Sequence, residues 1–387
     1  KILLYFSLLF YHLPYLNFIN ILMIRIEPYT DKEVKSVLKN LLEDKAFIKF
    51  IKTNLNSSTS KFLSIPGSSF LVMQLFKSKI KRINSIDEFQ DQVKIVLKNI
   101  VKQTIDNFET SGLDSLDHKK PYLFIGNHRD ITLDSALCNF SLDSVGLETT
   151  YNAIGDNLVR VGWMGDLLRL NKSFVISRSG DTKKEIYTNL FKASEFIKNT
   201  LDSGKHVWIA QKQGRSKDGL DKTDPAVLKM LHIALRKECN FEELTDYYNI
   251  VPQSVSYEID PLAKEKAKHL QGESTKNEND DISHIFKGVM DFKGNVNLSF
   301  GKQLSGKYTP EELADSIDNS ILNNYKLWDT NLYAYEFLKG EVDDSKYPTA
   351  SKYFNDLRAT MTNEDLKYIM IQYANPVLAI KENNNER

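Results

Sequence analysis

Apolar and polar residues alternate with the period of a helix over the first hundred residues. Thr30 lies three positions before Glu33, and Ser85 three before Glu88, which is the spacing of a helix capping box. Behind each cap, apolar residues recur three and four positions apart, as on one buried helical stripe. The first stripe consists of Val34, Val37, Leu38, Leu41 and Leu42. Residues 25–110 are therefore predicted to form a helical N-terminal region.

The pattern changes beyond this region to short apolar runs that end in glycine or in polar clusters. An amphipathic helix is predicted between the second and third runs, over residues 186–201. Strands that alternate with helices indicate an α/β fold, with a mixed, largely parallel sheet flanked by helices. Ligands of such sheets bind at the carboxyl ends of the strands. The predicted strands are 122–125, 174–176, 207–210, 250–257 and 296–300.

Helical patterns return towards the end of the chain. Residues 265–284 are rich in Lys, Glu, Asn and Asp, and we expect them to form an exposed insertion. Thr309 caps one further helix, and a last helix is predicted to start near Thr362. The chain thus divides into an α/β domain over residues 111–325 and a helical C-terminal extension over residues 326–387.

The first 24 residues stand apart from the rest. Residues 2–24 contain no Asp, Glu, Lys or Arg, and 18 of these 23 residues are apolar. About 20 such residues can span a bilayer as a helix, but Pro14 and several polar residues interrupt the run. The chain begins with Lys1, and Met23 stands just before the first globular-looking sequence. Three interpretations stay open: a non-native upstream extension, a membrane anchor or interfacial helix, and a buried helix.

Composition excludes several classes of protein. The 387 residues contain 51 Lys and Arg against 51 Asp and Glu, so the chain lacks the basic excess of a dedicated nucleic-acid-binding protein. Cys138 and Cys239 are the only cysteines, which excludes a disulfide scaffold and a cysteine-rich zinc module. Few, isolated cysteines fit a reducing, cytosol-facing compartment.

A histidine follows the first predicted strand of the α/β domain. His128 lies in a predicted strand-to-helix turn that also contains Asp130 and Asp134. A carboxylate in the first helical turn can reach back to the imidazole and fix its tautomer, which makes the pair a general base for a hydroxyl. From the residues alone, a capping network and a His/Asp metal hydrolase are alternatives, although no second histidine cluster supports a metal site.

Three more polar clusters follow later strands, and together the four resemble the motifs of the glycerolphosphate and lysophospholipid acyltransferase family. The His128 turn corresponds to the family's His-x4-Asp signature. Residues 174–180 resemble the Phe-x-x-Arg block, residues 211–216 the Glu-Gly block, and residues 250–257 the hydrophobic block that contains proline. The resemblance covers about residues 111–325 and rests on the order and spacing of all four blocks, since each block alone is weakly specific.

The sequence departs from the family pattern at two positions. Asp134 follows His128 with five intervening residues rather than four, and Asp130 is the other candidate partner. Gln213 stands where the family usually has glutamate, so this position keeps its hydrogen-bonding capacity but has no charge. These departures leave open a catalytically impaired relative that binds lipid or thioester without turnover.

The resemblance implies a reaction and a role for each block. An enzyme of this family moves a fatty acyl group from a thioester to a hydroxyl of a phosphorylated glycerol. His128 would be the general base, Asp134 or Asp130 would orient it, and the arginines of the next blocks would bind the acceptor's phosphate. The residues implied to bind substrate are Asn127, Arg178, Gln213, Gly214 and Arg215.

The resemblance also implies partners and a location. The donor would be acyl-CoA or acyl-carrier protein, and the acceptor glycerol-3-phosphate or lysophosphatidate, in phospholipid biosynthesis. The chemistry requires no cofactor and no metal. We expect the enzyme to act at the cytoplasmic face of a membrane, as a peripheral or singly anchored protein, and to bind no nucleic acid.

Overall fold

The computed structural model describes residues 25–58, 68–272 and 278–385. The apolar segment 1–24, for which three interpretations stay open, lies outside the described residues. Within those residues, the structure contains no helix that is both long enough and apolar enough to cross a bilayer.

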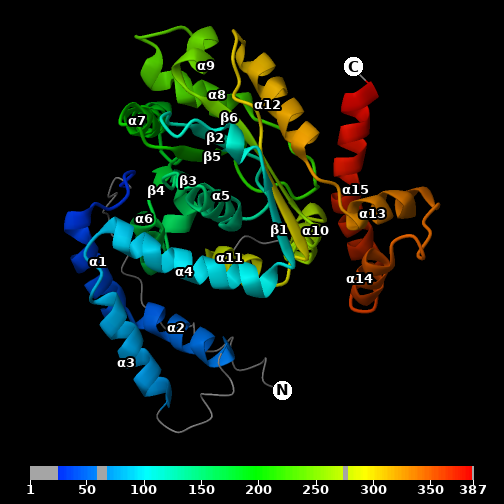
Figure 1. Cartoon of the computed structure of the whole chain (residues 1–387), viewed down its shortest axis with the longest axis horizontal. Helices are drawn as coiled ribbons and strands as arrows, with labels where there is room; N and C mark the ends of the chain where they lie inside the picture. Colours follow the sequence, from blue (N-terminus) through cyan, green and yellow to red (C-terminus); the bar gives the residue numbers. More distant parts are fainter. Residues whose placement is uncertain (1–24, 59–67, 273–277, 386–387) are drawn as a thin grey trace.

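A seven-stranded sheet forms the centre of the described structure, with helices on both faces (Figure 1). The strands are β1 (Asn107–Ser111), β2 (Leu123–Gly126), β3 (Tyr151–Gly155), β4 (Ser173–Ile176), β5 (Val207–Ala210), β6 (Ile250–Tyr257) and β7 (Asn295–Phe300). The helices are α1 (Asp31–Glu43), α2 (Lys45–Ser58), α3 (Ser68–Ile80), α4 (Ile86–Thr104), α5 (Leu133–Ser144), α6 (Gly162–Leu170), α7 (Lys183–Asp202), α8 (Pro225–His232), α9 (Leu244–Tyr247), α10 (Ala263–Leu270), α11 (Glu278–Met290), α12 (Pro310–Asn324), α13 (Asp329–Lys339), α14 (Pro348–Arg358) and α15 (Asn363–Asn385).

The strand order is β1-β7-β6-β2-β5-β3-β4, and all neighbouring strands are parallel except β6 and β7. This confirms the predicted α/β class with a mixed, largely parallel sheet. The five predicted strands are all present, but β1 and β3 were not predicted. β1 is an edge strand of sequence Asn-Phe-Glu-Thr-Ser whose residues are exposed or half-buried, so it lacks an apolar run. The helical N-terminal region therefore ends at Thr104, before β1, rather than at residue 110.

Two apolar layers sandwich the sheet. Alternation along β2 sends Leu123 and Ile125 to one face, where they pack with residues of α7, α8 and α12. Tyr122 and Phe124 point to the other face, which α4 and α5 cover. The central strands are thus buried on both sides, as expected for a largely parallel sheet. This burial fixes the carboxyl end of β2, where the polar turn with His128 begins.

The N-terminal helices form a separate apolar cluster beside the sheet (Figure 1). The predicted cap of α1 is present, since the Thr30 backbone N–H donates to the Glu33 carboxylate at 2.9 Å. In α4, Ser85 Oγ accepts from the Glu88 backbone N–H at 3.1 Å. The cluster also takes in α6 and α11, which lie far away in the sequence.

The described parts of the segment 265–284 do not form an exposed insertion, contrary to the prediction from its charges. It lies largely in α10 and α11, and in α10 Lys266 and Ala267 are buried. The C-terminal helices α13, α14 and α15 pack against α10 in an aromatic-rich cluster with Ala263 and Ala267. A lysine can be buried where its ammonium group finds acceptors, which composition alone does not reveal.

His206 makes the fold sensitive to acid. Its Nδ1 accepts the Tyr122 backbone N–H at 3.0 Å, and burial lowers its pKa from 6.5 to about 4. Between those values the unfolded chain binds a proton that the folded chain does not, so stability falls as pH drops from 6.5 to 4, by up to about 3 kcal/mol. Above pH 6.5 the group contributes nothing to the pH dependence.

We expect His206→Asn to flatten this dependence, because the amide oxygen can accept the same N–H without titrating. Urea unfolding at pH 7, 6, 5 and 4.5 measures it. A variant with the same loss of stability between pH 6.5 and 4.5 as the native chain would contradict this role of His206. The variant's lower stability at pH 7, from lost ring stacking with Tyr122, does not affect the comparison.

Candidate active site

The turn between β2 and α5 brings together a histidine and a buried carboxylate. β2 ends at Gly126 and α5 begins at Leu133, so Asp134 lies in the first turn of the helix. His128 Nδ1 is 3.0 Å from Asp134 Oδ2. The His128 side chain is 15% exposed and that of Asp134 is 1% exposed, so the ring remains accessible while its partner is enclosed. The structure thus places Asp134, rather than Asp130, against the imidazole.

Asp134 accepts hydrogen bonds through both of its carboxylate oxygens. The backbone N–H groups of Arg129 and Asp130 donate to Oδ2 at 2.7 and 2.9 Å, and the hydroxyl of Tyr257 donates to Oδ1 at 2.9 Å. Burial, followed by the negative charge of Asp134, raises the pKa of Tyr257 well above 10, which keeps its proton on the phenol. Because every partner donates, the carboxylate is held in one orientation, with Oδ2 directed at His128.

Asp130 has a different task in the same turn. Its Oδ1 accepts from the backbone N–H groups of Thr132 and Leu133, which caps the start of α5. Burial and the nearby charge of Asp134 raise its pKa. Its Oδ2 faces α11 so closely that a Cβ at Gly288 would lie 2.0 Å from it. Asp130 therefore packs against α11, and no hydrogen bond joins its carboxylate to His128.

Asn127 holds the turn to the sheet rather than facing a substrate. It is 1% exposed, its Nδ2 donates to Val255 O at 3.0 Å and Asp221 Oδ2 at 2.9 Å, and its Oδ1 accepts the Val255 N–H at 2.8 Å. Both ends of the buried amide are therefore engaged within the protein. The prediction that Asn127 binds substrate is therefore not supported by the geometry.

Arg129 links the turn to the loop after β5. Its Nε and Nη2 both donate to Asp221 Oδ2, and Nη2 also donates to Gly219 O at 3.0 Å. Burial lowers the pKa of Arg129, but the adjacent Asp221 outweighs it and raises the pKa above its ordinary value. The guanidinium also lies over the ring of Tyr325, 5.2 Å from its centroid.

An indole lies beneath the histidine. Trp208 of β5 has its ring centroid 6.3 Å from that of His128 in an edge-on arrangement, and its Nε1 donates to Gln253 Oε1 at 2.7 Å. A Cβ at Gly126 would approach the indole to 3.1 Å. Gly126 thus provides room for Trp208.

The second and third polar blocks meet at the same edge of the sheet. Arg178, which follows β4, donates through Nη1 to Gln213 Oε1 at 2.8 Å. Gly214 has a φ of +77°, a conformation that favours glycine. Two residues later, the Ser216 backbone N–H donates to His128 O at 2.7 Å, which places the third block directly beside the histidine.

Arg215, in the same loop, has unused donor capacity. Its Nη1 is buried and has no hydrogen-bond partner among the described residues. Its Nη2 lies 3.3 Å from Nδ1 of His284, a residue of α11. Its charge also lowers the pKa of Asp130 against the stronger upward effect of burial. A half-buried guanidinium with an unpartnered N–H donor beside a histidine is suited to an anion.

Sequence reasoning missed Trp208, Asp221, Tyr257 and His284 as parts of this site. Trp208 and Tyr257 lie in predicted strands, where their types indicated only core packing. His284 lies in the segment that its composition assigned to an exposed insertion. In the parts of the chain that the structure describes, no group of three or more His, Cys, Asp or Glu side chains has the arrangement of a metal site.

Known proteins match this chain in part. Residues 107–235, which run from β1 past α8, match the family model described as acyltransferase. No curated protein matches the chain significantly. A solved structure, the 1-acyl-sn-glycerophosphate acyltransferase PlsC from Thermotoga maritima, is similar over 75% of this chain and 94% of its own, with 13% identity and a TM-score of 0.37. The structural likeness at this score carries no argument. The assignment rests on the match to the family model, and the matched residues include the His128 turn and the Arg215 loop. Residues 107–235 of this chain are therefore similar to the acyltransferase family, and this match supports an acyltransferase activity.

Proposed function

We propose that the enzyme moves a fatty acyl group from a thioester, carried by coenzyme A or acyl-carrier protein, to a hydroxyl of glycerol-3-phosphate or lysophosphatidate. The observation that carries this proposal is the pairing of an accessible His128 with the enclosed Asp134, beside Arg215 with its open donor. A base and an anion site at one sheet edge fit an acceptor that has both a hydroxyl and a phosphate.

In the proposed mechanism, His128 acts as a general base. Its Nδ1 faces Asp134, so Nε2 is left to take the proton of the acceptor hydroxyl as the oxygen attacks the thioester carbonyl. The carbon–sulfur bond then breaks, and the proton passes from His128 to the departing thiolate. The Asp134 carboxylate stabilises the protonated ring, as the aspartate of a Ser-His-Asp triad does. No covalent acyl-enzyme is needed.

The acceptor's phosphate would bind between the second and third blocks. Arg215 offers its unpartnered Nη1. The guanidinium of Arg178 lies nearby, because it donates to Gln213, two residues before Arg215. The amide of Gln213 gives Arg178 an acceptor without adding a negative charge, which suits an anionic ligand. We further propose that the enzyme meets its lipid acceptor or product at a membrane surface.

Arg215→Ala is expected to raise the KM for the phosphorylated acceptor by about 10- to 100-fold, because hydrogen bonds to a charged group are lost. The KM for the acyl donor should change much less. Initial rates with each substrate varied in turn measure the difference. Arg236→Ala removes an exposed arginine and is the control. Equal increases in both KM values would contradict the phosphate-binding role.

Purified full-length protein with oleoyl-CoA, and either glycerol-3-phosphate or lysophosphatidate, tests the proposed function. Free thiol and lipid product are followed together, with liposomes and with acyl-carrier protein as the alternative carrier. Product that requires both substrates supports the proposal. Absence of product under all of these conditions would favour the catalytically impaired relative. Activity that a chelator abolishes would favour the metal hydrolase.

A further inference from the structure

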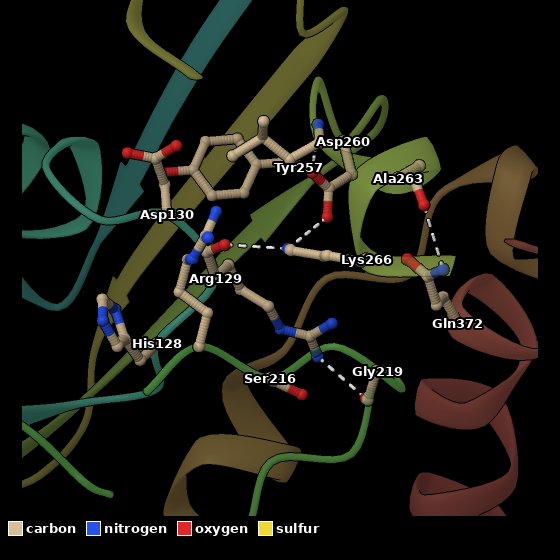
Figure 2. A network of polar contacts seen from close by, with 12 residues as sticks. His128, Arg129, Asp130, Ser216, Gly219, Tyr257, Asp260, Ala263, Lys266 and Gln372 are labelled. Atoms are coloured by element: carbon tan, nitrogen blue, oxygen red, sulfur yellow. Dashed lines mark hydrogen bonds and ion pairs between the residues drawn. The ribbon is translucent and has the colours of Figure 1, made fainter. Parts of the chain in front are cut away.

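A buried lysine contacts the backbone of the turn between β2 and α5, which contains His128 and is called the catalytic turn below. Lys266 of α10 is 3% exposed, and its Nζ donates to the carbonyl oxygen of Arg129 at 2.8 Å. Its Nζ also forms an ion pair with Asp260. Figure 2 shows the ammonium group lying between the Asp260 carboxylate and the backbone beside His128. No sequence motif marks this lysine.

The contact matters because of the peptide unit that it engages. The Arg129 carbonyl and the Asp130 N–H belong to one planar peptide group, and they point in opposite directions. Lys266 binds the carbonyl oxygen of this peptide group, and the Asp130 N–H of the same group donates to Asp134 Oδ2 at 2.9 Å. The same Oδ2 faces His128 Nδ1 at 3.0 Å. A cation at the carbonyl fixes the plane of the peptide and strengthens its N–H as a donor.

The C-terminal helices hold Lys266 and its ion-pair partner in place. Tyr373 of α15 accepts the Asp260 N–H at 2.7 Å, and Gln372 Nε2 donates to Ala263 O at 3.1 Å. The same helix meets the loop on the other side of Arg129, since a Cβ at Gly219 would lie 2.0 Å from Gln372 O. Gly219 O in turn accepts from the Arg129 side chain. α15 therefore supports both neighbours of the catalytic turn (Figures 1 and 2).

We propose that Lys266 is a positioning residue for the His128–Asp134 pair. Tyr373 and Gln372 of α15 would hold Lys266 in its position. The C-terminal extension is then part of the catalytic apparatus, although none of its described residues contacts His128. This inference rests on the proposed function only in taking His128 as the base.

Lys266→Met in the full-length chain tests the proposal, because methionine fills the same space without a donor. Asp260 keeps its hydrogen bond to the Leu262 N–H and is partly exposed, so it tolerates the loss of its partner. Lys268→Met, on an exposed position of the same helix, is the matched control. Side-chain 15N-histidine spectra report the Nδ1 hydrogen bond of His128 without requiring turnover, and His128→Gln assigns the signal.

We expect Lys266→Met to shift the His128 ring signals and to lower kcat by about 10-fold, with both KM values within about twofold, because the base is misaligned rather than the substrates. Lys268→Met should match the native protein in both measurements. His128 signals that stay unchanged in Lys266→Met would overturn the proposal, whatever happens to kcat. A native protein without turnover would reject the proposed function alone, since the spectra still decide the positioning role.

A second variant covers the case in which Lys266→Met does not fold. Tyr373→Phe removes the hydroxyl that accepts the Asp260 N–H and that also hydrogen-bonds with the Tyr353 hydroxyl, and it leaves the aromatic packing of α15 in place. We expect a smaller shift of the His128 signals and a smaller fall in kcat. Native values for both measurements would exclude α15 from the positioning network.

Discussion

Replacement of His128 by alanine is expected to lower kcat by about 10²- to 10⁴-fold, the range for loss of a general base. Asp134 keeps its three other hydrogen-bond donors when the imidazole is removed, so the thermal midpoint should change little. Because a base acts only once both substrates are bound, the KM values should stay close to those of the native enzyme. Steady-state rates of thiol release, together with a melting curve, measure both effects.

His118→Ala is the matched control, since His118 is exposed and lies outside the site. It should retain native kcat. Turnover in His128→Ala at the native rate would end the proposed mechanism, while loss of turnover with a lowered melting temperature would point to misfolding instead. The assay should be run with the acceptor that gives product, at saturating donor.

Asp134→Asn is expected to lower kcat by about 10²-fold or more, since the neutral amide cannot stabilise the protonated ring. The amide oxygen can keep the Oδ2 contacts with His128 and the two backbone N–H groups, and the NH2 group can donate to the Tyr257 hydroxyl. The fold should therefore survive. Steady-state rates and a melting curve of the variant measure both effects.

Asp130→Asn separates orientation of the base from capping of α5. Asparagine keeps an oxygen for the N–H groups of Thr132 and Leu133, whose hydrogen bonds the Asp130 side chain accepts. We expect a fall in kcat of less than about 10-fold, well below the effect of Asp134→Asn. If Asp130→Asn had the much lower kcat and Asp134→Asn kept a nearly native kcat, the wrong carboxylate would have been paired with His128.

Local sequence was sufficient for most of the secondary structure. The caps at Thr30 and Ser85 lie within three residues of their partners, and the apolar runs of β2, β4 and β5 are bounded by glycine or polar residues. Such signals depend on contacts a few positions apart. β1 was missed because its ladder with β7 joins Asn107 to Asn295, and an edge strand needs no apolar run of its own.

The sequence by itself also placed His128, Arg178 and Arg215 after strands, and therefore at one edge of the sheet. It left the partner of His128 open between two carboxylates, because both lie within one turn of chain. Only the folded turn, with Asp134 Oδ2 receiving three donors, decides between them.

The tertiary structure alone decided which polar residues support the site. Asp221 is 92 positions from Arg129, Tyr257 is 123 from Asp134, and Lys266 is 137 from Arg129. Contacts of this span depend on how the sheet and the C-terminal helices pack, which no local pattern encodes. Asn127 illustrates the converse: its place beside His128 suggested a substrate contact, but packing against β6 and Asp221 uses all of its hydrogen-bonding groups. Local sequence thus determined which polar residues lie at the sheet edge. Long-range packing determined which of them are left to face a substrate.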